Sequence, residues 1–116
     1  MSHDYSELTG ELSGALRDIR KALPEVTRGF SAMARAATAE GELDPKTKEL
    51  LAMGIAIAVR CQGCLGFHAQ ALVKLGTTEE EFMEMLGVAV YMGGGPSLMT
   101  AAEALLAFQE FRGKAD

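Results

Sequence analysis

Residues 44–68 read DPKTKELLAMGIAIAVRCQGCLGFH, and this stretch predicts the fold class. Asp44 followed by Pro45 is typical of a helix start, with an N-cap aspartate and a first-turn proline. The helix expected over 45–60 is amphipathic at first and then apolar on every face. The next helix carries the two cysteines, so the stretch predicts a helical hairpin that turns near residues 60–63. Because a helix that is apolar all round must be covered all round, we also expect a subunit interface here.

The rest of the chain predicts further helices and no strand. No run alternates with a period of two for long, and β-branched residues are sparse. Thr78 and Glu81 have the spacing of a capping box, and the glycines and proline at 93–96 end the preceding helix. We expect about six helices, at about 5–22, 24–39, 45–60, 61–76, 78–92 and 96–112. The sequence therefore predicts a single all-α domain spanning residues 1–116.

Apolar residues at three- and four-residue steps predict which helix faces turn toward the core. A chain of 116 residues is long enough to bury one core. The residues expected to point inward are Leu8, Leu12, Leu16, Ile19 and Leu23 in the first helix, Phe30, Met33 and Ala34 or Ala37 in the second, Phe82, Met85, Leu86, Val88, Ala89 and Tyr91 in the fifth, and Leu98, Leu105, Phe108 and Phe111 in the last.

Composition and charge narrow the class of protein. A net charge of −5 with 48% hydrophobic residues is typical of a globular protein. No cluster of Lys and Arg interleaves with aromatic residues, so we expect no nucleic-acid partner. The apolar run from Leu50 to Val59 is ten residues and too short to span a bilayer, so we expect no membrane partner. The polar, acidic residues 1–10 do not resemble a signal peptide, so we expect a cytoplasmic protein.

The segment Cys61–His68 holds both cysteines of the chain and one of its two histidines. On a helix, positions 61, 64 and 68 fall within an arc of about 60°. A thiol needs a nearby base or positive charge to become a thiolate near neutral pH, and His68 lies one turn beyond Cys64. In the cytoplasm structural disulfides are rare, so a CxxC pair favours catalysis or metal binding. The first interpretation is a dithiol/disulfide catalyst.

Three other interpretations of the same residues were weighed. A zinc site could use Cys61, Cys64 and His68, but it lacks a fourth ligand unless Glu49 or another subunit supplies one, because His3 lies in the N-terminal tail. Haem attachment requires a histidine directly after the second cysteine, and the chain has a leucine there. The two thiols could also be inert packing residues. The rival to an enzyme is therefore a zinc-binding or partner-binding helical domain.

Glu49 is the other residue with a possible role in this chemistry. A thioredoxin fold would need a strand leading into CxxC, and the segment from 46 to 59 predicts a helix instead. If the two helices form an antiparallel hairpin, Glu49 is carried toward the level of His68, where a carboxylate could orient the imidazole. The alternative is an ordinary surface glutamate in the polar run that begins at Lys46.

The pattern Glu49 … Cys61-x-x-Cys64-x-x-x-His68 on an all-helical chain resembles the carboxymuconolactone decarboxylase superfamily, and within it the alkylhydroperoxidase AhpD-like branch. The resemblance covers about residues 25–110. It implies helical-hairpin units that assemble into homo-trimers or homo-hexamers. Members with the cysteine pair are thiol-dependent peroxidases or disulfide reductases that act in antioxidant defence.

The resemblance also implies roles for individual residues. Cys64 would attack a hydroperoxide, Cys61 would resolve the product as a disulfide, His68 would assist Cys64, and Glu49 would anchor the proton relay. A dithiol or protein reductant would then restore the thiols, and no metal or other cofactor is implied. From the residues alone, the helix dipole favours Cys61 as nucleophile and the nearby imidazole favours Cys64, which we prefer.

Two features of the superfamily bear on this resemblance. Peroxidase members commonly place a histidine directly before the second cysteine, where this chain has Gly63. The proton relay implied for this chain is correspondingly shorter. The decarboxylase branch generally lacks the cysteine pair, which makes lactone decarboxylation the weaker alternative.

Overall fold

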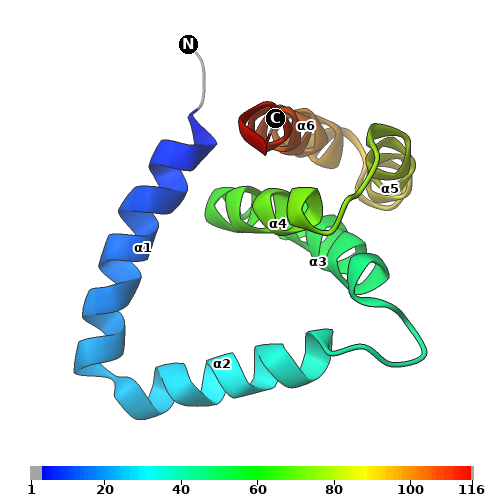
Figure 1. Cartoon of the computed structure of the whole chain (residues 1–116). Helices are drawn as coiled ribbons and strands as arrows, with labels where there is room; N and C mark the ends of the chain where they lie inside the picture. Colours follow the sequence, from blue (N-terminus) through cyan, green and yellow to red (C-terminus); the bar gives the residue numbers. More distant parts are fainter. Residues whose placement is uncertain (1–3, 116) are drawn as a thin grey trace.

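The computed structural model describes residues 4–115, and within that range it contains six α-helices and no strand (Figure 1). This confirms the predicted all-α class and the number of helices. Most of the expected boundaries agree with the observed ones to within a few residues. The helices are α1 (Tyr5–Ala22), α2 (Pro24–Thr38), α3 (Pro45–Val59), α4 (Gln62–Lys74), α5 (Glu79–Gly93) and α6 (Gly95–Ala115).

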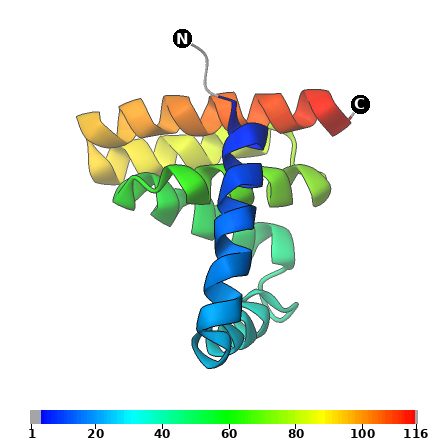
Figure 2. The same cartoon turned by 90° about the vertical axis from the view of Figure 1, so that its left-hand side faces the viewer.

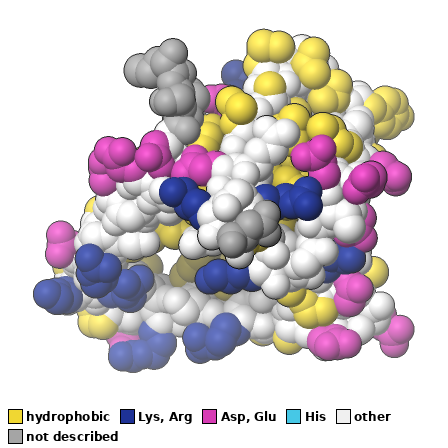
Figure 3. All heavy atoms as spheres, turned by 45° about the horizontal axis from the view of Figure 1, so that its top comes forward, with side chains coloured by type: hydrophobic (Ala, Val, Ile, Leu, Met, Phe, Trp, Pro, Cys, Tyr) yellow, Lys and Arg dark blue, Asp and Glu magenta, His cyan; other side chains and the backbone are white. Residues whose placement is uncertain are grey.

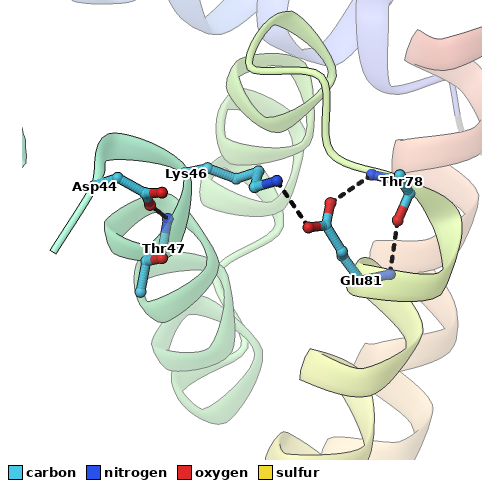
Figure 4. Close-up of polar contacts among 5 residues, drawn as sticks. All are labelled: Asp44, Lys46, Thr47, Thr78 and Glu81. Atoms are coloured by element: carbon cyan, nitrogen blue, oxygen red, sulfur yellow. Dashed lines mark hydrogen bonds and ion pairs between the residues drawn. The ribbon is translucent and has the colours of Figure 1, made fainter.

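Local hydrogen bonds set the starts of α3 and α5 (Figure 4). The Asp44 carboxylate accepts the backbone N–H of Thr47 at 2.8 Å. Hydrogen bonding from the Thr47 side chain, and then from its backbone, lowers the pKa of Asp44. At the start of α5, Thr78 and Glu81 form the predicted capping box, with reciprocal bonds of 3.0 and 2.9 Å. Lys46 then donates to Glu81 at 2.7 Å, which lowers the pKa of Glu81 and raises that of Lys46. The two helix N-termini are thereby joined.

The turn between α3 and α4 is built on Arg60, whose backbone lies in the left-handed region at φ 58° and ψ 49°. The Arg60 N–H donates to Ile57 at 3.2 Å, and the Cys61 N–H donates to Ala56 at 3.1 Å. These are the two bonds of a Schellman motif. Helix α4 ends with the same pair of bonds around Gly76, at φ +76°. The motif reverses the chain within two residues and places Cys61 at the start of α4.

The core lies among α3, α4, α5 and α6, with the first turn of α1 packed against it. Phe82 of α5 stacks on Phe108 of α6 with ring centroids 4.2 Å apart, and both rings are fully buried. Such aromatic pairs contribute about 0.5–1.5 kcal/mol beyond the area they bury. The largest fully buried side chains are Tyr5, Met53, Ile57, Leu65, Leu72, Phe82 and Phe108.

Helix α2 departs from the predicted packing. It lies apart from the α3–α6 bundle, and Figures 1 and 2 show it leaving α1 at a sharp bend. None of its residues is buried, so the expectation that Phe30 and Met33 point into the core is wrong. The physical reason is that α2 meets only α1 and α3, within the residues described. The other residues expected inward that are exposed instead are Leu16, Ile19, Leu23, Val88, Tyr91 and Leu98.

The surface is divided between charged and apolar regions. Figure 3 shows Lys and Arg side chains gathered at its lower left, on the side of the α1–α2 bend, and hydrophobic side chains at its upper right. Among the helices described, none is long and apolar enough to cross a membrane.

Candidate functional site

The two cysteines occupy the first turn of α4 and are joined as a disulfide. Cys61 is the N-cap residue, with extended backbone angles of φ −97° and ψ 98°. Its Sγ accepts the backbone N–H of Cys64 at 3.2 Å. Because Cys61 lies outside the helix proper, the predicted common stripe applies to Cys64 and His68 only. The sulfur of Cys61 instead faces the positive end of the α4 dipole.

Glu49 and His68 are brought together by the α3–α4 hairpin. Glu49 Oε2 lies 2.7 Å from His68 Nδ1, across a sequence separation of 19 residues. The carboxylate side chain is only 15% exposed, whereas the imidazole is 31% exposed. An ionised carboxylate only accepts hydrogen bonds, so Nδ1 must be the donor and Nε2 is left for another partner. The pair therefore sets the tautomer of a histidine one turn from Cys64.

Helix α1 covers the far side of the cysteine turn. A Cβ added at Gly63 would lie 2.7 Å from Leu12 Cδ1, and one added at Gly66 would lie 2.6 Å from Thr9 Cγ2. Real Cβ atoms do not come that close to other heavy atoms, so both glycines permit the close approach of α1. Gly63, where the sequence resemblance implies a histidine in peroxidase members, therefore packs against Leu12.

A second support for the turn comes from α6 and was not predicted from the sequence. Gln62 Nε2 donates to Glu103 Oε2 at 2.9 Å, which links one of the two residues between the cysteines to α6. Tyr5 is buried beside this region, and burial, with smaller effects from Glu103 and Glu110, raises its pKa. Glu110 also accepts the backbone N–H groups of Tyr5 and Ser6 at 2.8 and 2.9 Å. No local motif signals these contacts, because they depend on where α6 lies.

The zinc interpretation finds no support in this geometry. Within residues 4–115 no group of three or more His, Cys, Asp or Glu side chains could hold a metal ion. In the disulfide both sulfurs are bonded to each other, and a metal would require them as thiolates. His3, the other histidine of the chain, lies outside the described residues.

The arrangement combines the Cys61–Cys64 disulfide, a histidine one helix turn beyond Cys64 and a carboxylate hydrogen-bonded to that histidine. Cys61 and Cys64 are half-buried, and Cys64 packs against the hydrophobic core. A thiol–disulfide couple with a base within one helix turn has the parts needed for two-electron redox chemistry.

Comparison with known proteins identifies the family of this chain. The family model of the carboxymuconolactone decarboxylase family matches residues 24–107. The chain belongs to this family. The matched range includes Glu49, both cysteines and His68, and excludes all of α1.

Two relatives of this carboxymuconolactone decarboxylase family protein match most of its length. An uncharacterized protein of Cupriavidus necator is 32% identical over 108 residues, covering 93% of this chain and 96% of that protein. Uncharacterized protein 4 of the cox locus of Paracoccus denitrificans is 32% identical over 101 residues, covering 87% and 91%.

Two solved structures show the same fold. The crystal structure of an apo carboxymuconolactone decarboxylase family protein from Legionella pneumophila superposes with a TM-score of 0.93 at 58% identity, covering 96% of this chain and 99% of that one. A family member from Thermotoga maritima superposes with a TM-score of 0.82 at 27% identity, covering 92% of each chain. For the Thermotoga protein a role in the antioxidative response has been suggested.

Proposed function

We propose that this protein is a thiol-dependent peroxidase that reduces hydroperoxides and is recycled by a dithiol or protein reductant. The observation that carries the proposal is the 2.7 Å contact between Glu49 and His68 Nδ1, beside a cysteine pair that closes as a disulfide. Supporting it are the resemblance to AhpD-like proteins and the suggested antioxidative role of the Thermotoga relative.

The reaction begins with reduced protein. His68 takes the proton of the Cys64 thiol at Nε2, while Glu49 holds the proton on Nδ1 and stabilises the imidazolium. The Cys64 thiolate attacks the terminal oxygen of the hydroperoxide, so an S–O bond forms and the O–O bond breaks. The alkoxide leaves with the proton from His68 as an alcohol, and Cys64 is left as a sulfenic acid.

Cys61 completes the oxidative half of the cycle. Its thiolate, at the N-terminus of α4, attacks the sulfur of the Cys64 sulfenic acid and expels water once the hydroxyl is protonated. The protein has then lost two electrons and two protons, and the hydroperoxide has become an alcohol and water. An external dithiol returns both electrons by thiol–disulfide exchange and is itself oxidised to a disulfide.

The test is a thiol count on reduced protein mixed with one equivalent of an organic hydroperoxide. We expect both thiols to be lost and the protein mass to fall by two hydrogen atoms, with full reversal by a dithiol. Cys61→Ser should stop at a sulfenic acid on Cys64, whereas Cys64→Ser should keep its remaining thiol. Sulfenic acid forming on Cys61 instead would reverse the two roles.

Glu49→Gln tests the proton relay while leaving both cysteines unchanged, because it keeps the shape of the Glu49 side chain and removes its charge. General-base catalysis typically contributes about 10²–10⁴-fold, so we expect thiol loss to slow by about 10²-fold or more. Glu84→Gln, at an exposed position on α5, is the matched control and should react at the wild-type rate. Unreactive thiols in the wild-type protein would refute the proposal, and reactivity only after chelation would favour zinc. Release of carbon dioxide from a carboxymuconolactone with no loss of thiols would favour the decarboxylase alternative.

A further inference from the structure

The two residues enclosed by the disulfide, Gln62 and Gly63, are each held by a different helix. Gly63 packs against Leu12 of α1. Gln62 Nε2 donates to Glu103 Oε2 of α6 at 2.9 Å, across 41 residues of sequence. The geometry of the cysteine turn therefore depends on α1 and α6 as well as on α4.

Helix α6 places two carboxylates at the starts of other helices. Glu110 accepts the backbone N–H groups of Tyr5 and Ser6, the first two residues of α1, at 2.8 and 2.9 Å. Glu103 lies two helical turns earlier on the same face of α6, and it bonds to Gln62, the first residue of α4. A negative charge is what the positive end of a helix dipole favours. The two contacts therefore have the same electrostatic form, and one of them lies at the cysteine pair.

The bond to Gln62 holds the charge of Glu103 at the start of α4. The Gln62 amide is neutral, so it orients the carboxylate without cancelling its charge. Glu103 is half-buried, where charges are screened less than on the open surface. Buried Tyr5 responds to this charge, since its pKa is raised by burial first and then by Glu103 and Glu110, and it stays neutral.

The other charged groups around the cysteines act differently. Arg60 directly precedes Cys61, whose sulfur faces the positive end of the α4 dipole, and both of these charges favour a thiolate. The Glu49 carboxylate is hydrogen-bonded to His68 at 2.7 Å and so acts on the imidazole. Glu103 instead brings a negative charge to the helix start where a thiolate would form.

We infer that Glu103 is a positioning residue that acts through Gln62 and biases the cysteine pair toward the disulfide. The disulfide is uncharged. Reduction adds two electrons and two protons, and a thiol at the helix start then loses its proton to become a thiolate. The Glu103 carboxylate repels that thiolate and not the disulfide, so it lowers the reduction potential and makes the dithiol a stronger reductant. The inference rests on the proposed function in one respect, that the pair passes between these two states.

The reduction potential of Glu103→Gln tests this inference without any hydroperoxide. Glutamine keeps an oxygen that can accept the Gln62 hydrogen bond, and it removes the charge. The protein is equilibrated with reduced and oxidised dithiothreitol, which gives up two electrons and two protons to the protein disulfide and becomes a cyclic disulfide. We expect the equilibrium to shift about three- to tenfold toward the protein dithiol. A tenfold shift raises the potential of this two-electron couple by about 30 mV.

Two further variants serve as controls in the same measurement. Glu84→Gln removes an exposed carboxylate on α5 and should leave the potential unchanged. Glu103→Asp keeps the charge and should stay closer to wild type than Glu103→Gln does. An unchanged or lowered potential in Glu103→Gln would overturn the inference. That result differs from a failure of the peroxidase proposal, which would appear as thiols that do not react with a hydroperoxide.

The pH dependence distinguishes the charge of Glu103 from a purely structural effect. The thiol pKa of each protein is read from the absorbance of the thiolate, and it should be lower in Glu103→Gln than in wild type. Above this pKa the difference in potential between the two proteins should be fully present. As the pH falls below it, both states of the pair are uncharged and the difference should disappear. A difference that is the same at every pH would assign the effect to packing and refute the inference.

A double-variant cycle tests the part played by Gln62. Gln62→Ala removes the bond that holds the Glu103 carboxylate at the start of α4, so adding Glu103→Gln should shift the potential less in this background than in wild type. Neither side chain belongs to the buried core, and all three variants should keep their helix content by circular dichroism. Equal shifts in the two backgrounds would show that Glu103 does not act through Gln62, contrary to the inference.

Discussion

Arg60 is the only residue other than glycine with a positive φ in the described part of the chain, and this predicts a stabilising substitution. The left-handed conformation costs a residue with a Cβ about 1–2 kcal/mol. Arg60→Gly removes that cost but adds about 0.5–1 kcal/mol of backbone entropy to the unfolded chain. Taking the middle of each range, the net gain in the free energy of unfolding should be about 0.5–1 kcal/mol. An unfolding entropy of about 2.1 cal/mol/K per residue gives about 0.24 kcal/mol/K for this chain, so Tm should rise by about 2–4 °C.

The end of α4 supplies the matched control, because it has the same hydrogen bonds with Gly76 at the left-handed position. Gly76→Arg should lower Tm by a similar amount, so the two substitutions should act in opposite directions. The assay is thermal unfolding by circular dichroism of the oxidised protein at one fixed concentration, since association would make Tm depend on concentration. If Arg60→Gly lowers Tm, or both variants shift it the same way, backbone strain at Arg60 is not the governing effect.

Three further predictions follow from the packing and the charges. Gly63→Ala should lower the free energy of unfolding by about 1–3 kcal/mol, because the added methyl group meets Leu12. The loss should be smaller in a Leu12→Ala background. If the losses of the two single variants, measured by urea unfolding, simply add in the double variant, the contact is not their cause. Phe108→Ala should cost about 3–5 kcal/mol in the same assay, and a loss below about 2 kcal/mol would place the core elsewhere. Lys46 lowers the pKa of Glu81, so this carboxylate contributes stability that is present above pH 4.5 and lost as the pH falls through its folded pKa. The difference in unfolding free energy between wild type and Lys46→Met should therefore shrink below pH 4.5, and a constant difference would contradict this.

Helix boundaries were predictable because local chemistry sets them. The proline after Asp44 and the capping pair Thr78 and Glu81 each act within four residues, and the structure has all of them where the sequence placed them. The direction each helix faces was less predictable. An amphipathic stripe such as that containing Phe30 shows that a helix needs an apolar partner, but not whether the partner is in the same chain. The exposed Val88 of α5 is the same case, since it faces a groove and not the core.

The site was predictable to the extent that it depends on one hairpin. The proximity of Glu49 and His68 follows from the lengths of two adjacent helices, and the structure brings them to 2.7 Å. The prediction that Cys61, Cys64 and His68 share one helix face was only partly right, because Cys61 caps α4 from an extended conformation. The bond from Gln62 to Glu103 spans 41 residues, and its formation depends on how α6 packs against α4.

The packing of α1 gives a physical account of the departure at Gly63. A histidine there would need the space that Leu12 Cδ1 occupies, 2.7 Å from the position of its Cβ. Helix α1 lies wholly outside the residues matched by the family model, so Leu12 belongs to a part of the chain that the family pattern does not describe. With no side chain at that position, proton transfer in the proposed reaction depends on Glu49 and His68 alone. Removing the Glu49 charge should therefore slow the reaction of this protein more than it would slow that of a protein whose relay has a second histidine.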